Sequence, residues 1–458
     1  MALNSAVILA AGAGTRMKSK IPKVLHQLCG HSMIDHVIRA VKASHINDII
    51  VIIGSGADQV EKKLEKSDVQ FVLQKEQLGT GHAVQQAKDK IPNQGNVIVL
   101  YGDMPMLSSE TIKAFMAFHE TEKNDLSVLT AKVENPYGYG RIVKNHKGEM
   151  IKIVEHKDAD EEELLIDEIN SGVYCFDAPF LKKHLHDIDN NNNQKEYYLP
   201  DLISIAVKNQ YKLGTYQTLN SEELMGVNSR KQLMEADAAM RKKINEKWMD
   251  EGVTIINPEH TYIDPDVKIG IDTVIYPGAT LKGNTIIGED CMIGQNTRIE
   301  NSIIKNRVEI QSSVILDSRV DEATTIGPFA YLRPGSNIGK NVKIGDFVEI
   351  KNAAIGDGSK ASHLAYVGDA EVGKNVNIGC GVIFVNYNGK EKQKIVVEDD
   401  AFVGSNVNLV APVVVKNKGY VAAGTTVTME VPEGALCIGR GKQRHIDGWV
   451  DRKNIKKK

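Results

Sequence analysis

The sequence is poor in cysteine, carries little net charge and contains no long apolar run. Its cysteines are scattered, odd in number and form no C-x-x-C pair: they are Cys29, Cys175, Cys291, Cys380 and Cys437. This usage is typical of a reducing compartment, and it offers no structural zinc site. The formal net charge is -3, so no general basic field favours nucleic acid. Because no apolar run reaches membrane-spanning length and no signal-peptide pattern opens the chain, we expect a cytoplasmic protein without nucleic-acid or membrane partners.

Two common phosphate-binding patterns are also missing from the glycine-containing loop "LAAGAGTRMKSKIPKVL" near the start of the chain. Met17 stands where a dinucleotide fingerprint G-x-G-x-x-G needs its third glycine, and no G-K-[ST] of a Walker A loop is present. Instead, Gly12 and Gly14 free the backbone to approach anionic oxygens, and Arg16 and Lys23 add positive charge. This combination favours a triphosphate ligand, while a tight strand-to-helix turn remains the alternative explanation of the glycines.

The first half of the chain alternates strand-like and helix-like segments. The short β-branched runs "AVILA", "DIIVIIG" and "NVIVLYGD" are separated by helical patterns such as "SMIDHVIRAVKA". We therefore predict an α/β Rossmann-like domain over residues 1–228 of the 458-residue chain. Ligands of such sheets bind beyond the carboxyl ends of the strands, where both the glycine loop and Asp103 lie. Asp103 is a suitable oxygen ligand for Mg²⁺, although an aspartate there could also cap the following turn.

The second half follows a different rhythm. Residues 229–251 are polar, free of Pro and Gly, and predict a linker helix ended by Gly252. From residue 252 to 458, aliphatic residues recur every six positions, as at Ile269, Ile275, Leu281, Ile287, Ile293 and Ile299. This period predicts a left-handed parallel β-helix of hexapeptide repeats. The phase breaks near 351–371 and 385–402, and we interpret the second break as an ejected loop.

One histidine stands out in this repeat domain, because only His363 and His445 occur after residue 260. A lone histidine in a β-helix is more often a surface or packed residue than a catalyst. The polar groups that the repeat places on neighbouring turns favour a catalytic site, and they are Arg333, Lys351, Tyr366, Asn377, Asn386 and Tyr387.

The order of short motifs resembles that of a known family. Along the chain come "LAAGAGTRM", "PKVL", "QLGTGHAV", "YGDMPML", "GYGRIV", "IVEHKDA", "EINSGVY" and "LMGVNSR". They are similar to the motifs of bacterial UDP-N-acetylglucosamine pyrophosphorylases. Together with the hexapeptide half, the chain looks like a bifunctional GlmU-type enzyme, in which N-acetylglucosamine-1-phosphate uridyltransferase is fused to glucosamine-1-phosphate N-acetyltransferase.

For the first domain, the resemblance implies a uridyltransferase site with Mg²⁺ shared by Asp103 and Asn228. Arg16 and Lys23 are implied to face the phosphates as catalytic cations. The implied nucleotide contacts are Leu9, Ala10, Ala11, Gly12, Lys23, Gln74, Gly79, Thr80, Tyr101, Gly102 and Asp103. The sugar is implied to contact Gly140, Glu155 and Asn170.

For the second domain, the resemblance implies acetyl transfer from acetyl-CoA, with His363 removing a proton from the sugar amine. A histidine whose pKa lies near neutrality suits that role. Glu349 is our candidate for orienting His363. The sugar phosphate is implied to contact Arg333, Lys351, Tyr366, Asn377, Asn386 and Tyr387. Acetyl-CoA is implied to contact Cys380, Ser405, Ala423 and Arg440.

The implied product is UDP-N-acetylglucosamine, a precursor of peptidoglycan and lipopolysaccharide. The implied substrates are glucosamine-1-phosphate, acetyl-CoA, N-acetylglucosamine-1-phosphate and UTP, and the implied assembly is a homotrimer. Two alternatives remain open. One is a single-activity sugar-1-phosphate nucleotidyltransferase with a regulatory or oligomerising β-helix, and the other is a nucleotide-binding assembly protein that uses the β-helix as a spacer.

Overall fold

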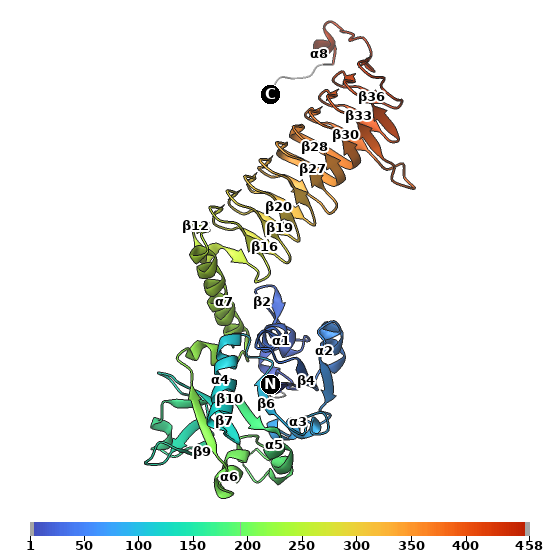
Figure 1. Cartoon of the computed structure of the whole chain (residues 1–458). Helices are drawn as coiled ribbons and strands as arrows, with labels where there is room; N and C mark the ends of the chain where they lie inside the picture. Colours follow the sequence, from blue (N-terminus) through green and yellow to red (C-terminus); the bar gives the residue numbers. More distant parts are fainter. Residues whose placement is uncertain (1–3, 193, 454–458) are drawn as a thin grey trace. The chain divides into compact units, whose positions relative to one another are not determined.

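The computed structural model describes residues 4–192 and 194–453. The chain forms two compact units, one up to Met240 and one from Arg241 (Figure 1). The division falls inside helix α7 (Arg230–Asp250), rather than at the predicted edges of a linker. Each half of the helix packs with its own unit: Ala236 joins a small cluster with Leu28 and Met33, and Trp248 joins the core of the second unit.

The first unit is a mixed sheet with strand order β11-β7-β10-β6-β1-β4-β5. The bounds are β1 (Asn4–Ala10), β4 (Asp48–Ile53), β5 (Gln70–Leu73), β6 (Asn96–Tyr101), β7 (Leu126–Lys132), β10 (Glu168–Asp177) and β11 (Leu213–Gln217). Strands β8 (Arg141–Lys144) and β9 (Met150–Val154) extend it beside β10, and β2 (Gln27–Leu28) pairs β3 (His31–Ser32). The pairs of β1 with β4 and β6 are parallel, as predicted, whereas β10 runs antiparallel to β6 and β7.

Helices cover both faces of this sheet because its strands are apolar on both sides. Ala6, Ile8 and Ala10 of β1 pack in one core layer, and Val7 and Leu9 pack in the other. The helices of the first layer are α1 (Met33–Ala43), α2 (Ala57–Leu64) and α4 (Ser109–Glu122), and those of the second are α3 (Thr80–Gln86), α5 (Ala178–His184) and α6 (Asp201–Lys208). Short 3-10 turns are η1 (Thr15–Met17), η2 (Lys23–Leu25), η3 (Glu163–Leu165), η4 (Leu185–Asp187) and η5 (Ser221–Leu224). The predicted Rossmann-like α/β domain is confirmed.

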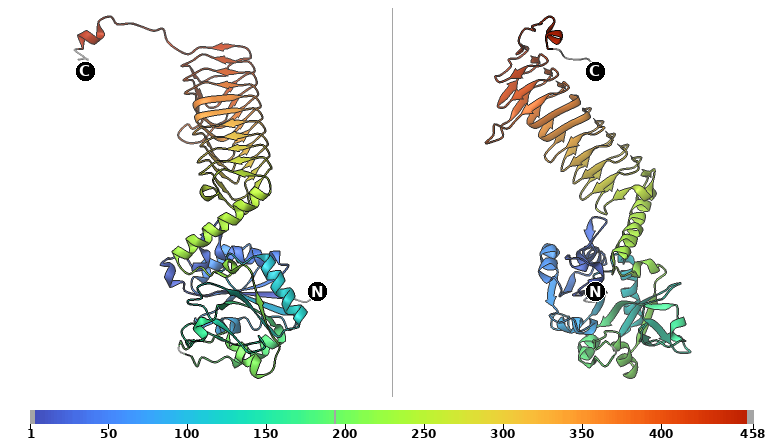
Figure 2. Two further views of the ribbon diagram at one scale, coloured as in Figure 1. Left: turned by 90° about the vertical axis from the view of Figure 1, so that its left-hand side faces the viewer. Right: turned by 180° about the vertical axis from the view of Figure 1, so that it is seen from behind.

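After α7, the second unit coils short parallel strands into three flat faces (Figure 2). Face A holds β12 (Thr254–Ile255), β15 (Val274–Ile275), β18 (Met292–Ile293), β21 (Glu309–Ile310), β24 (Thr325–Ile326), β29 (Asn377–Ile378), β32 (Phe402–Val403), β35 (Tyr420–Val421) and β37 (Leu436–Cys437). Face B holds β13 (Tyr262–Ile263), β16 (Thr280–Lys282), β19 (Arg298–Glu300), β22 (Val314–Leu316), β25 (Tyr331–Leu332), β30 (Ile383–Val385), β33 (Asn408–Val410) and β36 (Thr426–Val427). Face C holds β14 (Lys268–Ile269), β17 (Ile286–Ile287), β20 (Ile303–Ile304), β23 (Arg319–Val320), β26 (Asn337–Ile338), β31 (Ile395–Val397) and β34 (Val413–Val415).

Two long strands, β27 (Lys343–Ile355) and β28 (Lys360–Val372), run through all three faces in turn. The turn η6 (Pro258–His260) lies near the start of the unit and α8 (Trp449–Arg452) near its end. Each coil stacks on the next through parallel pairing, which matches the predicted left-handed β-helix.

The six-residue phase does break at 351–371, as predicted, but the aliphatic ladder continues through the break. Ile355, Ala361, Val367 and Val372 are all buried in the same aliphatic ladder. The steps from Ile350 to Ile355 and from Val367 to Val372 are five residues long, so the coil is shorter there but not interrupted. The second break is a real projection, but a shorter one than predicted, because β31 already rejoins the ladder at Ile395.

Within the described residues, no helix combines the length and the apolar character that crossing a membrane requires.

Candidate active sites

A pocket of about 240 Å³ lies at the carboxyl ends of β1 and β6 in the first unit. Most of the predicted nucleotide contacts line it, namely Leu9, Ala10, Ala11, Gly12, Lys23, Gln74, Gly79, Thr80, Tyr101 and Asp103. Gly102 stands just behind them, where its N–H donates to the Leu9 carbonyl at 2.9 Å. The parallel pairing of β1 with β6 explains the convergence, because it brings the ends of both strands to one edge of the sheet.

The glycines of the opening loop do two different things. A side chain at Gly12 would meet no atom within 4 Å, so the backbone there faces open space that a ligand could enter. Gly14 has a φ of +59°, and a Cβ on it would lie 2.6 Å from the Cβ of Lys23. Gly14 therefore lets the loop fold closely against Lys23. Arg16, by contrast, is exposed in η1 and does not line the pocket, so the structure does not bring it to Lys23.

The Lys23 ammonium joins the two predicted metal ligands. Its Nζ donates to the Asp103 carboxylate and, at 3.0 Å, to Oδ1 of Asn228. The Asp103 carbonyl accepts from the N–H of Val227 at 2.9 Å, which ties the segment before α7 to the end of β6. Lys23 lies 80 positions from Asp103 and 205 from Asn228 in the sequence, yet the three share one small polar cluster, which we call the cation cluster (Lys23, Asp103 and Asn228).

The cation cluster fits a magnesium ion chemically. It offers one carboxylate and one amide oxygen, both hard donors, and a positive group already lies between them. In the described part of the chain, no group of three or more His, Cys, Asp or Glu forms a metal cage. A site with few protein ligands suits Mg²⁺, which usually keeps water and substrate phosphates in its coordination shell.

A segment that we did not predict closes one side of the pocket. Tyr197 accepts from the N–H of Gly81 and donates its own N–H to the Leu78 carbonyl, both at 2.8 Å. Glu196, beside it, lines the pocket, and Val24, Gln77 and Ala83 do so as well. Nothing in the local sequence around Glu196 indicates a site, because only tertiary packing brings this polar loop to the Gly79 turn.

The predicted sugar contacts form a group of their own. A Cβ on Gly140 would lie 3.3 Å from Oε1 of Glu155 and 3.5 Å from Cβ of Asn170. Asn170 donates to the Tyr174 hydroxyl at 2.7 Å, and burial raises the pKa of the Glu155 carboxyl. Tyr101 connects this group with the pocket, because it lines the pocket and its ring packs against Gly172.

In the second unit, a column of predicted residues follows the corner between faces A and B. His363 starts it, and the next coils place Cys380, Ser405 and Ala423 at the same corner. The N–H of Gly381 donates to the Leu364 carbonyl at 2.7 Å, and that of Asn406 to the Cys380 carbonyl at 2.8 Å. The N–H of Gly424 donates to the Ser405 carbonyl at 2.8 Å, and Nη1 of Arg440 to the Ala423 carbonyl at 2.8 Å. These bonds stack the four predicted acetyl-CoA contacts in line with His363.

A second cluster of polar residues lies at the corner between faces B and C. Nδ2 of Asn386 donates to the Tyr366 hydroxyl at 3.3 Å and to Oδ2 of Asp369 at 2.5 Å. The neighbouring Lys392 ammonium lowers the pKa of the Lys351 ammonium, and the Asp369 carboxylate opposes that shift. Asp369 and Lys392 are therefore members of this cluster that the sequence interpretation missed.

Two further predicted contacts are placed differently: Tyr387 forms an antiparallel β-bridge with Lys392 of that cluster, and Asn377 lies on another face. The hydroxyl of Tyr387 donates to the Gly389 carbonyl at 2.7 Å, within its own loop. Asn377 lies on face A, in register with Lys360 and Phe402.

The predicted partner of His363 is wrong. Oδ1 of Asp346, not Glu349, lies 2.7 Å from Nδ1 of His363. Glu349 instead accepts from Nη1 of Arg333 at 2.8 Å. The reason is register: Asp346 pairs directly with His363 along β27 and β28, whereas Glu349 pairs with Tyr366. The 17-residue offset of this coil was the signal that could have identified Asp346.

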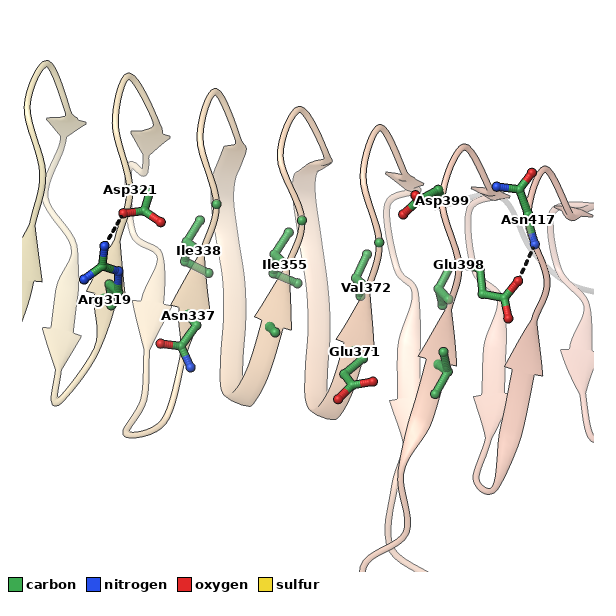
Figure 3. Close-up of a pocket in the computed structure, with 16 residues that line it drawn as sticks. Arg319, Asp321, Asn337, Ile338, Ile355, Glu371, Val372, Glu398, Asp399 and Asn417 are labelled. Carbon is green, nitrogen blue, oxygen red and sulfur yellow. Dashed lines mark hydrogen bonds and ion pairs between the residues drawn. The ribbon is translucent and has the colours of Figure 1, made fainter.

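A hollow on the second unit contains none of the predicted site residues. It is a groove of about 720 Å³ along face C, lined by residues such as Asn337, Ile355, Glu371 and Glu398 (Figure 3). Its polar groups pair locally, as where Glu398 accepts from the N–H of Asn417 at 2.9 Å. It therefore gives no support to a catalytic role for that face.

Comparison with known proteins places this geometry in context. Residues 6–161 match the family model described as a MobA-like NTP transferase domain, and residues 266–301 match that of bacterial transferase hexapeptide repeats. The chain is 56% identical over 453 residues to "Bifunctional protein GlmU" of Alkaliphilus metalliredigens, covering 99% of both chains. It is 55% identical to the protein of the same name from Clostridioides difficile, covering 98% of both. A crystal structure of a putative glucose-1-phosphate thymidylyltransferase from Bacillus anthracis aligns with 52% of this chain and 94% of its own, at 21% identity and a TM-score of 0.42.

Proposed function

The chain belongs to the family of bifunctional GlmU proteins, which unite a uridyltransferase with an acetyltransferase, and we propose that its two units divide these activities. One observation carries the proposal: each unit holds its own polar cluster, with Lys23 between Asp103 and Asn228 in the first and His363 in the second. Together the two activities convert glucosamine-1-phosphate into UDP-N-acetylglucosamine.

In the first unit, a phosphate oxygen of N-acetylglucosamine-1-phosphate attacks the α-phosphorus of UTP. The bond from that phosphorus to the bridging oxygen of the β-phosphate breaks, and pyrophosphate leaves. The uridine nucleotide lies in the pocket beside Gly12 and Gly79, and the sugar lies against Gly140, Glu155 and Asn170. Lys23 stabilises the negative charge that spreads over the phosphates in the transition state.

Asp103 and Asn228 would hold Mg²⁺, which supplies charge neutralisation on the phosphates when it is bound. With the metal held there, the Lys23 ammonium would contact the triphosphate. We propose that Arg16, exposed in η1, reaches the phosphates from outside the pocket.

In the second unit, the amine of glucosamine-1-phosphate attacks the thioester carbonyl of acetyl-CoA. The carbon–nitrogen bond forms, the carbon–sulfur bond breaks, Nε2 of His363 takes the proton of the amine, and coenzyme A leaves as the thiolate. Acetyl-CoA lies along the column of Cys380, Ser405 and Ala423, with Arg440 at its end. Arg333 and Lys351 attract the sugar phosphate, and Glu349 holds Arg333 in place.

Assembly and location remain predictions. We propose a homotrimer, because a β-helix has flat faces that can pair with those of other copies. Sedimentation at assay concentration tests this, and a monomer would count against it. The cytoplasmic location that the sequence suggests is also a prediction.

A single reaction mixture tests the proposed function. Glucosamine-1-phosphate, acetyl-CoA, UTP and Mg²⁺ are supplied together, and mass spectrometry follows UDP-N-acetylglucosamine. We expect the wild type to form UDP-N-acetylglucosamine from this mixture. His363→Ala should form it only when N-acetylglucosamine-1-phosphate replaces glucosamine-1-phosphate. Asp103→Asn should accumulate N-acetylglucosamine-1-phosphate without converting it further. A wild type that acts only on preformed N-acetylglucosamine-1-phosphate would instead indicate a single-activity nucleotidyltransferase.

A further inference from the structure

We infer that Asp346 is a positioning residue for His363, which holds the imidazole so that Nε2 is free to take the proton of the amine. This inference rests on the proposed acetyl transfer in the second unit. It assigns a role to a residue that no motif of the sequence pointed to.

The contact itself is direct. Oδ1 of Asp346 lies 2.7 Å from Nδ1 of His363, and the two residues are paired partners in the parallel ladder of β27 and β28. In-register partners project their side chains from the same side of the coil. The neutral imidazole has one proton, and a carboxylate can only accept, so the proton belongs on Nδ1 and the lone pair on Nε2.

The corner that carries this pair is built with unusual backbone. The residue after each partner has a left-handed conformation, with φ of +58° at Phe347 and +32° at Leu364. Bulky side chains rarely adopt it, and such conformations persist where the surrounding structure enforces them. Phe347 stacks on Phe329 of the preceding coil, with ring centroids 5.6 Å apart. Two successive coils therefore repeat one bend, and that bend turns Asp346 and His363 outward together.

The charge of the pair also suits the reaction. Hydrogen bonding to His363 lowers the pKa of the Asp346 carboxyl, with a smaller contribution from Lys343, so Asp346 is ionised at neutral pH. An ionised carboxylate stabilises the imidazolium that forms when His363 takes a proton. The other charged group that acts on the Asp346 carboxyl is Lys343 of the same strand, β27. The side chains are 61% exposed for His363 and 40% for Asp346, so we expect a smaller effect than in a buried pair.

The experiment compares Asp346→Asn with wild type in the full chain. We expect kcat for acetyl transfer to fall about 10- to 100-fold, with little change in KM for glucosamine-1-phosphate. NMR of ¹⁵N-histidine-labelled protein, with His363 assigned by comparison with His363→Ala, should show a mixture of tautomers in place of the single Nδ1–H form.

Asp321→Asn is the matched control, because Asp321 accepts from Nη2 of Arg319 at 2.9 Å on face C, away from His363. It removes the same charge and should leave kcat and the His363 resonances unchanged. An unchanged tautomer of His363 in Asp346→Asn would overturn the inference, as would the same losses in Asp321→Asn. Failure of the proposed acetyl transfer gives a different result from failure of this inference. If His363 is not the base, His363→Ala retains acetyl transfer, regardless of how Asp346 affects the His363 tautomer.

Discussion

Replacing Lys23 by Met tests the role of the cation cluster. The substitution keeps most of the side-chain volume and removes the ammonium that Asp103 and Asn228 share. Because the cluster belongs entirely to the first unit and His363 to the second, we expect uridylyl transfer to fall and acetyl transfer to persist.

The surroundings of the ion pair set the magnitude of the effect. The Lys23 and Asp103 side chains are 16% and 11% exposed, so removing one partner leaves a largely buried charge uncompensated. Breaking such a pair costs about 3–5 kcal/mol, and we expect the lower end because neither group is fully buried. Loss of one charged donor to the transition state costs a further factor of about 10²–10³ in kcat.

Three measurements on one preparation separate these effects. Pyrophosphate release reports uridylyl transfer, thiol release from acetyl-CoA reports acetyl transfer, and calorimetry reports unfolding of the first unit. Adding Asp103→Asn to Lys23→Met removes the stranded charge, so the double variant should recover stability without recovering uridylyl transfer. The reasoning would be refuted if both activities fell equally in folded protein, or if the double variant were less stable than Lys23→Met.

Three further substitutions probe pH dependence, packing and the pocket. Burial raises the pKa of Asp201 from 3.8 to about 6, so its charged form destabilises the fold above that pH. Asp201→Asn should therefore raise the free energy of unfolding at pH 7.5 by on the order of 1–2 kcal/mol. This gain should shrink as the pH falls through 6 and vanish below 4. An equal gain at pH 7.5 and below pH 4 would show that the buried charge of Asp201 is not its cause. Ile350 is fully buried in the ladder, so Ile350→Ala should lower the free energy of unfolding of the second unit by about 2–5 kcal/mol in denaturant. A decrease below about 1 kcal/mol would argue against close packing there. A Cβ at Gly79 would lie 2.5 Å from the Tyr197 carbonyl, so Gly79→Ala should raise KM for UTP at least about tenfold. Gly148 also has a positive φ, but a Cβ there would meet open space, so Gly148→Ala should leave KM for UTP unchanged.

The six-residue repeat predicted the fold of the second unit but not the exact length of every coil. It predicted the β-helix correctly, because a coil of flat faces must bring an aliphatic residue to the axis at each face. The strict period breaks at 351–371, as predicted, where a step of five residues replaces six. A strict period cannot anticipate a shortened corner, whereas hydrogen bonding between coils keeps Ile355 and Val372 in the ladder despite it.

The glycine loop and the first metal ligand were accessible from sequence for a similar reason. Strand ends in a parallel sheet meet at one edge, so the positions of Gly12 and Asp103 after apolar runs were enough to bring them together. Arg16 carried the same charge signal as Lys23, but its place in η1 leaves it exposed beside the pocket. A side chain's charge is visible in the sequence, and its direction is not.

What the sequence alone determined is therefore the class of each unit, the family, and the residue types that meet at each site. These follow from local periodicity and from motif order, both of which are properties of the chain read in one dimension. Only the tertiary structure decided which carboxylate faces His363. Asp346 and Glu349 are three residues apart on one strand, and the register of two neighbouring coils, set by their backbone hydrogen bonds, pairs the first with His363 and the second with Tyr366.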